Sequence, residues 1–303
     1  FSEPFSDSSQ IPTFLVSKLA KNDITVALSG DGGDELFGGY TTYSKANSIL
    51  KKMSYIPSLL RGELNFSSII SIFEKYPFLK KKIESILSKK YNFNNGGLIE
   101  KLIKINKLIN SNSPNKFYEN FISINTNPDN IVIGAKTVNN INFELFNDLH
   151  FYDMMMGVDM LTYLPDNIMC KVDRCSMGVS LETRAPFLDH RVIAFSSKLP
   201  LEMKIRGNKG KWILKKLVNR YIPTHLIDRP KKGFSVPLNE LLRGPLKDWC
   251  IDLLNESEMK KEGYLKSGPI NDKLKEHLSG NRDWSTYLWN VLMFQQWLKL
   301  IDE

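Results

Sequence analysis

Apolar residues near the start of the chain predict a helix followed by a strand. Between residues 9 and 21 they recur at helical spacing, with Ser8 or Ser9 as a candidate N-cap. Residues 24–28 form a short β-branched run that is typical of a buried parallel strand. The glycine-rich residues 29–40 follow at once. This order of helix, strand, glycine loop and helix predicts part of an α/β layer.

The rest of the chain has mostly helical periodicity. From about 45 to 148, prolines and Asn-Gly clusters interrupt a Lys/Asn/Ile-rich stretch that contains no catalytic constellation. Residues 150–245 include a Met-rich helix over 153–163 and an extended run that ends before Pro186. The aromatic tail, residues 246–303, is again helical in pattern, and we expect it to pack as core. We therefore expect a helix-rich body joined to a fragment of sheet.

Composition limits the classes of protein to which the chain can belong. Of its 303 residues, 42% are hydrophobic and 24% are charged, which excludes a disordered tail, a collagen and a small disulfide scaffold. Three cysteines without a CxxC pair favour a reducing compartment, and we expect a cytoplasmic protein. No uncharged apolar run approaches the roughly 20 residues that span a bilayer, so we expect no membrane partner.

The net charge of +8 comes mostly from lysine, which supplies 32 of the 41 basic residues. These lysines form pairs and triplets on stretches with the pattern of helix faces. A nucleic-acid binder more often interleaves arginines with aromatic residues, so the pattern favours a solvated surface and we expect no nucleic-acid partner. An anionic substrate such as ATP fits the same charge.

Residues 29–40 fail three familiar glycine-loop motifs. A P-loop needs a lysine where Gly39 stands, and the dinucleotide fingerprint needs a third glycine where Glu35 stands. The nucleophile elbow fails as well, since no glycine flanks Ser29 at the required spacing. The loop therefore belongs to none of these three classes.

The same loop still has the composition of a phosphate site. A glycine-rich turn between strand and helix exposes backbone N–H groups to an anion. Asp31, Asp34 and Glu35 would repel a phosphate unless a divalent cation bridged them, and hard oxygen ligands suit Mg²⁺. One acid would then hold Mg²⁺ while a second transfers protons. The alternative is that Asp34 and Glu35 only complement the helix dipole.

A second group of candidate residues is basic. Lys171 and Arg174 lie three residues apart, and a Glu/Arg alternation follows at 182–184. Lys231 and Lys232 lie in a loop bounded by prolines. A lysine is a compact charge that can follow a phosphate through a reaction. The alternatives are structural ion pairs for the Arg/Glu residues and an exposed loop for the two lysines.

Four blocks of the sequence resemble one family in their order along the chain. The first is Pro-Phe-Ser-Asp-Ser-Ser at positions 4–9, and the second is Ser-Gly-Asp-Gly-Gly-Asp-Glu-Leu-Phe-Gly-Gly-Tyr at 29–40. The third and fourth are residues 171–189 and 210–237. These blocks are similar to those of the glutamine-hydrolysing asparagine synthetases, over perhaps two thirds of the chain.

That resemblance implies a fold and a reaction. The fold is the α/β architecture of the adenine nucleotide alpha hydrolase-like proteins, of which this chain would hold a predominantly helical part with a remnant of the parallel sheet. The reaction is ATP-dependent amide formation, in which ATP and Mg²⁺ adenylate a carboxylate and ammonia from glutamine then displaces AMP. Aspartate is the implied carboxylate.

The resemblance also implies roles for individual residues. Asp31 matches the acid of intermediate formation and ammonia deprotonation, and Asp34 matches the Mg²⁺/pyrophosphate acid. Lys231 matches the lysine that neutralises phosphate charge, and Arg174 matches a basic substrate or pyrophosphate contact. The residues that match nucleotide contacts are Ser29, Gly30, Asp31 and Gly32.

Two features of the family are missing from this sequence. These are the amino-terminal glutaminase domain and a Ser-Gly-Gly-x-Asp-Ser pyrophosphate loop. We therefore expect residues 1–303 to be one synthetase domain that is truncated at its N-terminus. Its expected regions are 1–45, the remnant of the ATP-binding sheet, 46–148, a divergent helical region, and 149–303, a helical region with the catalytic loops.

Further expectations follow for partners and alternatives. The full-length polypeptide would carry the glutaminase domain, the isolated chain would be inactive, and a homodimer is compatible with the sequence. The side of residues 24–28 that lacks sheet neighbours would leave apolar surface for association. Two alternative functions stay open. The first is amidation of a sugar uronate or another carboxylate in surface-polysaccharide synthesis, and the second is an inactive helical interaction module.

Overall fold

The chain divides into two compact units that are discontinuous in sequence. Unit 1 comprises Phe1–Ser6, Lys52–Val138 and Pro237–Glu303, and unit 2 comprises Asp7–Lys51 and Asn139–Val236. The computed structural model describes residues 1–55, 68, 72–73, 75–76, 78–79, 83, 98–124, 128–135, 141–227, 234 and 236–302. The expectation of one domain over residues 1–303 stays a prediction.

Unit 2 holds the strands and the glycine-rich loop of the described chain. Its first elements are α1 (Gln10–Lys21), β1 (Val26–Leu28), α2 (Gly33–Phe37) and α3 (Thr41–Ser54). After residue 141 come 3₁₀-helix η2 (Phe143–Phe146), α9 (Phe151–Leu161), π-helix η3 (Leu164–Met169), α10 (Cys170–Met177), β2 (Glu182–Arg184), 3₁₀-helix η4 (Pro186–Leu188), α11 (His190–Ser197), α12 (Leu201–Lys204), α13 (Trp212–Val218) and α14 (Thr224–Ile227).

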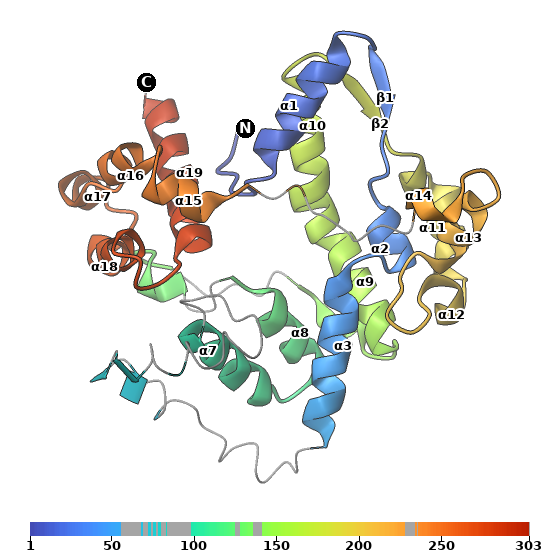
Figure 1. Cartoon of the computed structure of the whole chain (residues 1–303), viewed down its shortest axis with the longest axis horizontal. Helices are drawn as coiled ribbons and strands as arrows, with labels where there is room; N and C mark the ends of the chain where they lie inside the picture. Colours follow the sequence, from blue (N-terminus) through green and yellow to red (C-terminus); the bar gives the residue numbers. More distant parts are fainter. Residues whose placement is uncertain are drawn as a thin grey trace. The chain divides into compact units, whose positions relative to one another are not determined.

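The two strands of unit 2 form the parallel remnant of sheet that the sequence predicted. In Figure 1, β1 lies beside β2, and Val26 pairs with Glu182 while Leu28 pairs with Arg184. The prediction of a buried strand is wrong for the described chain, since Val26 is 39% exposed and Leu28 is 76% exposed. The structure is thus mostly helical with a two-stranded parallel remnant of sheet, as the sequence predicted.

Two helices pack beside this sheet remnant. Helix α1 packs lengthwise against α10 (Figure 1). Helix α10 follows η3 without a break. Helix α9 supplies the apolar core of unit 2 through Met154, Met155 and Val158, which are at most 2% exposed. The Met-rich run that predicts a helix over 153–163 is therefore confirmed, with its start two residues earlier.

The described part of unit 1 is helical apart from an isolated bridge between Val132 and Leu265. Its elements are α7 (Leu98–Ile109), α8 (Pro114–Ile122), 3₁₀-helix η1 (Pro128–Asn130), α15 (Leu238–Arg243), α16 (Lys247–Leu253), α17 (Glu256–Glu262), α18 (Ser267–Leu278) and α19 (Ser285–Asp302). Leu242, Met259, Ile270, Leu288 and Leu292 are fully buried in its core. The prediction that the aromatic tail packs as core is confirmed, since Trp289 and its neighbours join this cluster.

None of the helices in the described part of the chain is both long enough and apolar enough to cross a bilayer.

Candidate functional site

The loop after β1 closes on itself through backbone hydrogen bonds. The Ser29 N–H donates to the Arg184 carbonyl at 2.8 Å, which extends the β1–β2 ladder by one residue. The Gly33 N–H donates to the Gly30 carbonyl at 3.2 Å. Gly32 has φ of 85°, and a side chain there would overlap Leu188. Gly32 is therefore required for the turn and for its packing on η4.

Ser29 and Gly30, which are neighbours in this loop, contribute an unpartnered polar atom and open space respectively. Within the described residues, the Ser29 hydroxyl oxygen is buried and has no hydrogen-bond partner. Buried polar atoms of this kind are uncommon in native proteins and call for a ligand, an ion or water. Gly30 is exposed, and a Cβ built on it would meet nothing within 4 Å. The loop can therefore admit a ligand close to its backbone.

Asp34 is paired with a lysine that the sequence analysis did not single out. Its Oδ2 lies 3.1 Å from Nζ of Lys211, which is held in the left-handed region with φ of 56°. The Lys211 N–H donates to the Phe37 carbonyl at 2.9 Å, so the lysine is anchored to the end of α2. A side chain at Gly39 would overlap both Asp34 and Lys211. The signal for Lys211 was its place in a Gly-Asn-Lys-Gly-Lys run.

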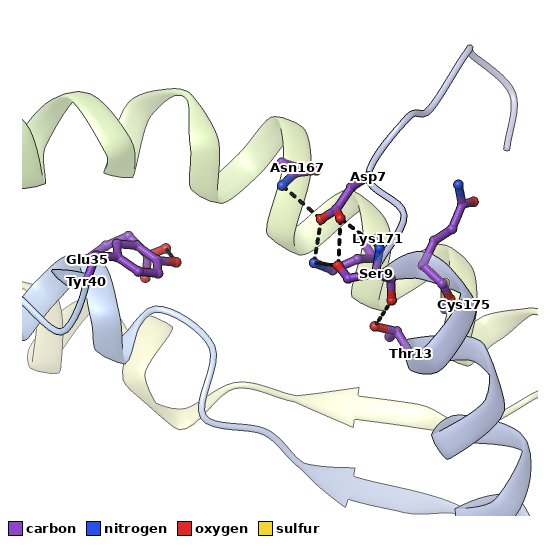
Figure 2. Close-up of polar contacts among 9 residues, drawn as sticks. Asp7, Ser9, Thr13, Glu35, Tyr40, Asn167, Lys171 and Cys175 are labelled. Atoms are coloured by element: carbon purple, nitrogen blue, oxygen red, sulfur yellow. Dashed lines mark hydrogen bonds and ion pairs between the residues drawn. The ribbon is translucent and has the colours of Figure 1, made fainter. Parts of the chain in front are cut away.

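The neighbouring acid, Glu35, points the other way into the protein. It is 1% exposed, and it accepts a 2.5 Å hydrogen bond from the Tyr40 hydroxyl. Burial raises the pKa of Glu35 above its usual value, while the Tyr40 bond opposes that rise. Burial and the Glu35 carboxylate also raise the pKa of Tyr40. Glu35 is thus a structural acid that ties the loop to Tyr40 (Figure 2).

The donor set of the loop fits Mg²⁺ bound together with a nucleotide. Magnesium usually keeps several waters and takes one or two carboxylates plus phosphate oxygens. No group of three or more potential metal ligands occurs in the described residues, so they form no all-protein cage. The Asp34 side chain is 24% exposed and supplies one hard oxygen ligand at the loop. Asp31, which is half-buried, begins the same turn.

Two of the basic candidates, Lys171 and Arg174, lie one turn apart on α10. Arg174 is exposed on α10, and Lys171, one turn earlier, is only 8% exposed and pairs with Asp7 at 2.8 Å. Glu182 and Arg184 form a surface ion pair at 2.7 Å, which agrees with the structural alternative. Lys231 lies outside the described residues. The structure thus places Ser29, Asp31 and Asp34 next to one another on one loop, and Arg174 makes no hydrogen bond or ion pair to them within the described residues.

Comparison with known proteins gives matches along nearly the whole chain. The family described as asparagine synthase matches residues 1–299. Asparagine synthetase 1 (glutamine-hydrolysing) of Bacillus subtilis is 30% identical over 298 residues, which are 98% of this chain and 44% of that protein. A Mycobacterium tuberculosis protein is 30% identical over 310 residues, covering 99% of this chain and 43% of its own length.

Asparagine synthetase 3 (glutamine-hydrolysing) of Bacillus subtilis is more distant, at 26% identity over 240 residues, 78% of this chain and 31% of that protein. The chain spans less than half the length of these relatives. No solved structure gives a significant match. The predominantly helical architecture with a parallel sheet remnant agrees with the adenine nucleotide alpha hydrolase-like fold. Because the family match covers almost every residue, the chain belongs to the asparagine synthase family.

Proposed function

We propose that the protein carrying this chain forms amides by an ATP-dependent, two-step reaction. A carboxylate oxygen attacks the α-phosphorus of ATP, and pyrophosphate leaves. Ammonia then attacks the acyl carbon of the adenylate, and AMP leaves as the amide forms. The observation that carries this proposal is the open loop with its unpartnered Ser29 hydroxyl and its Asp34–Lys211 pair, in a chain of this family.

The loop residues can bind and orient the nucleotide. Ser29 offers a buried hydroxyl to the nucleotide, and Gly30 leaves its backbone open to close approach. Asp34 would hold Mg²⁺, which supplies charge neutralisation of the phosphates when bound. Lys211 brings a positive charge to the same position, where its ammonium can exchange Asp34 for a phosphate oxygen.

The remaining roles extend the proposal to residues of the other motifs. Asp31, at the start of the turn, would accept a proton from the attacking ammonia. Arg174 and Lys231 would stabilise negative charge on substrate and pyrophosphate, as the family resemblance implies. Aspartate as acceptor and glutamine as ammonia source are supported by the names of the relatives. The three free cysteines support a cytoplasmic location.

Pyrophosphate release from ATP–Mg²⁺ tests this function on the full-length protein. Ammonia is supplied, and L-aspartate, D-glucuronate and no acceptor are compared, with the amide product identified by mass. Aspartate-dependent release supports the proposal. Release that depends on glucuronate alone would instead favour the uronate alternative. Absence of release with either acid would favour the inactive interaction module.

Two adjacent lysines give a matched test of the basic loop. Lys231→Ala should slow adenylate formation at least tenfold while the melting temperature changes little, because its ammonium is assigned to the phosphates. Lys232→Ala serves as the control and should stay within twofold of wild type. The reverse pattern would show that the alignment of this loop with the family is wrong by one residue.

A further inference from the structure

Asp7 is the centre of a hydrogen-bond cluster that joins the chain before α1 to η3 and α10. Its carboxylate accepts bonds from Lys171 Nζ at 2.8 Å, from Asn167 Nδ2 at 3.1 Å and from the Ser9 hydroxyl at 2.7 Å (Figure 2). The Ser9 N–H adds a fourth bond at 2.9 Å. The segment before α1 and the continuous η3–α10 helix therefore meet at one side chain.

The Ser9 side chain takes part in this cluster instead of capping helix α1. It occupies the N-cap position of α1, as the sequence predicted, but its side chain makes no capping bond. Instead its oxygen lies 2.8 Å from Lys171 Nζ and 2.7 Å from Asp7. A serine N-cap usually contributes about 1 kcal/mol through its bond to the first turn. The Asp7 cluster replaces that bond.

The Lys171 side chain is nearly buried, and its ammonium group is held by Asp7 and Ser9. Its side chain is 10% exposed, and its ammonium contacts both Asp7 and Ser9 at 2.8 Å. Burial acts to raise the pKa of Asp7, but the hydrogen bonds from Lys171 and Ser9 outweigh it and hold the pKa below its usual value. Asp7 and Lys171 are therefore an oppositely charged pair at neutral pH.

The cluster lies at the start of α10, which is held at both ends. Asn167 belongs to η3, the π-helical turn that leads into α10, and it also hydrogen-bonds Tyr163. Such π-turns occur often at functional sites. Beyond the C-terminal end of α10 the chain enters β2, whose last carbonyl accepts the Ser29 N–H. Helix α10 thus connects the Asp7 cluster to the nucleotide loop.

We propose that Asp7 and Lys171 are positioning residues that fix α10 and thereby hold Arg174 where it acts on the substrate. Lys171 and Arg174 are three residues apart and so are neighbours on the surface of the helix, with Lys171 buried and Arg174 exposed beside it. A rotation of α10 about its axis would move both side chains together. This inference rests on the proposed function, because that function gives Arg174 its role.

A purely structural ion pair makes a different prediction. When one partner of a buried pair is removed, the remaining charge destabilises the fold, whereas a neutral pair of similar volume often restores stability. A neutral pair restores volume, but the bonds that Lys171 donates to Asp7 and Ser9 stay lost. Stability and turnover therefore separate if the pair has a positioning role, and they recover together if it does not.

The first experiment measures kcat for pyrophosphate release and the melting temperature of the full-length protein. Asp7→Asn and Lys171→Met should each lower kcat at least tenfold and lower the melting temperature. The double variant Asp7→Asn/Lys171→Met should regain most of the melting temperature and remain at least tenfold low in kcat. Recovery of both quantities would overturn the proposal. Asp23→Asn and Lys198→Met, exposed residues of the same unit, are the controls and should stay within twofold.

A double-mutant comparison tests the route through Arg174. In the Arg174→Ala background, Asp7→Asn should lower kcat by less than twofold, because the side chain that it positions is already gone. An undiminished tenfold loss in that background would show that Asp7 acts by another route, and the proposal would fail.

Hydrogen exchange decides the structural part without any activity. In the double variant, amides of Cys170–Met177 should exchange at least tenfold faster than in wild type, while those of α19 should not change. Unchanged exchange in α10 would overturn the proposal even if the protein is active. Absence of pyrophosphate release in wild type would instead refute the proposed function. The exchange result would still decide whether Asp7 and Lys171 fix α10.

Discussion

The two units bury different kinds of polar residue. In unit 2 the buried polar side chains include four that carry charge when ionised, Glu35, Asp159, Lys171 and Lys204. In unit 1 the buried polar side chains of the described chain are Ser267, His277, Ser285 and Gln295. Burial lowers the pKa of His277, so its neutral form is favoured there. Charge is thus buried in the unit that holds the glycine-rich loop.

This difference indicates what each unit has to do. Buried charges are costly unless they are paired, and they fix the groups that pair with them. Glu35 holds Tyr40, Asp159 accepts a 2.8 Å bond from Tyr43, and Lys171 holds Asp7. The core around α19 is mostly apolar and contributes stability chiefly by burial. We expect substitutions in the core of unit 1 to affect stability alone, whereas those in unit 2 affect the chemistry, the stability or both.

The largest effect should come from Asp34→Asn. Loss of the carboxylate removes the assigned Mg²⁺ ligand and the partner of Lys211, so pyrophosphate release should fall by about 100-fold or more, in the range seen for lost charge-stabilising groups. Release is measured at saturating Mg²⁺, with Asp23→Asn as the exposed control. Wild-type rates in the Asp34 variant would remove this residue from the metal site.

Leu292→Ala should show the opposite profile in unit 1. Leu292 is fully buried, and its truncation should lower the free energy of unfolding by about 2–5 kcal/mol through lost burial and a cavity. Urea unfolding measures the change, and kcat of the remaining folded protein should be unaltered. Leu300→Ala, at a position 63% exposed, is the matched control with little expected change. Equal losses in both variants would contradict the assigned core.

Tyr40→Phe should have a smaller effect on stability. The substitution removes only a hydroxyl and changes the shape of the side chain little. It nevertheless leaves the buried Glu35 carboxylate without its 2.5 Å hydrogen bond. Hydrogen bonds to charged groups contribute about 1.5–3 kcal/mol, so the free energy of unfolding should fall by that amount. Tyr55→Phe, at a position 85% exposed, is the control. An unchanged free energy of unfolding would show that Tyr40 does not stabilise Glu35.

The smallest expected effect is the pH dependence contributed by His277. Its pKa in the folded chain lies below the ordinary value of 6.5, chiefly through burial and secondly through Arg243. Below pH 6.5 the unfolded chain binds a proton that the folded chain does not, so stability is lost as the pH falls. Each unit of pKa depression contributes up to about 1.4 kcal/mol.

Replacement of His277 by Gln should therefore flatten the pH dependence of unfolding. The free energy of unfolding is compared at pH 7.5 and pH 5.5 by urea titration of wild type and variant. A slope that is equally steep in both proteins would show that His277 binds a proton in the folded state.

The helices could be predicted from the sequence because their signals are local. Apolar spacing placed α1 within one residue of Gln10–Lys21, and the extended run before Pro186 gave β2. Burial of β1 could not be predicted in this way. An apolar, β-branched strand has the same pattern whether or not neighbouring strands cover it, and Leu28 is exposed in the described structure.

Candidate site residues could be named from the sequence only where a motif held them together. Asp31 and Asp34 were proposed because the glycines around them form a recognisable loop, and their roles stay predictions. Lys211 was missed because its pairing with Asp34 joins distant parts of the chain, and no local pattern encodes that contact. Asp7 was quoted within a motif, yet its bond to Lys171 also depends on tertiary packing. Motifs gave the residues, and packing gave the pairs.

The parallel pairing of β1 with β2 also constrains the order in which a nascent chain can acquire its structure. Within the described residues the strand partner of Val26 is Glu182, so this pairing forms only after Glu182 has left the ribosome. The Ser29 N–H meets the Arg184 carbonyl only after Arg184 has followed. Closing so long a loop costs conformational entropy before the strand contacts stabilise it, so such pairings form late in folding. Helix α1 can form locally during synthesis. The glycine loop is therefore ordered only after more than half of the chain has been translated.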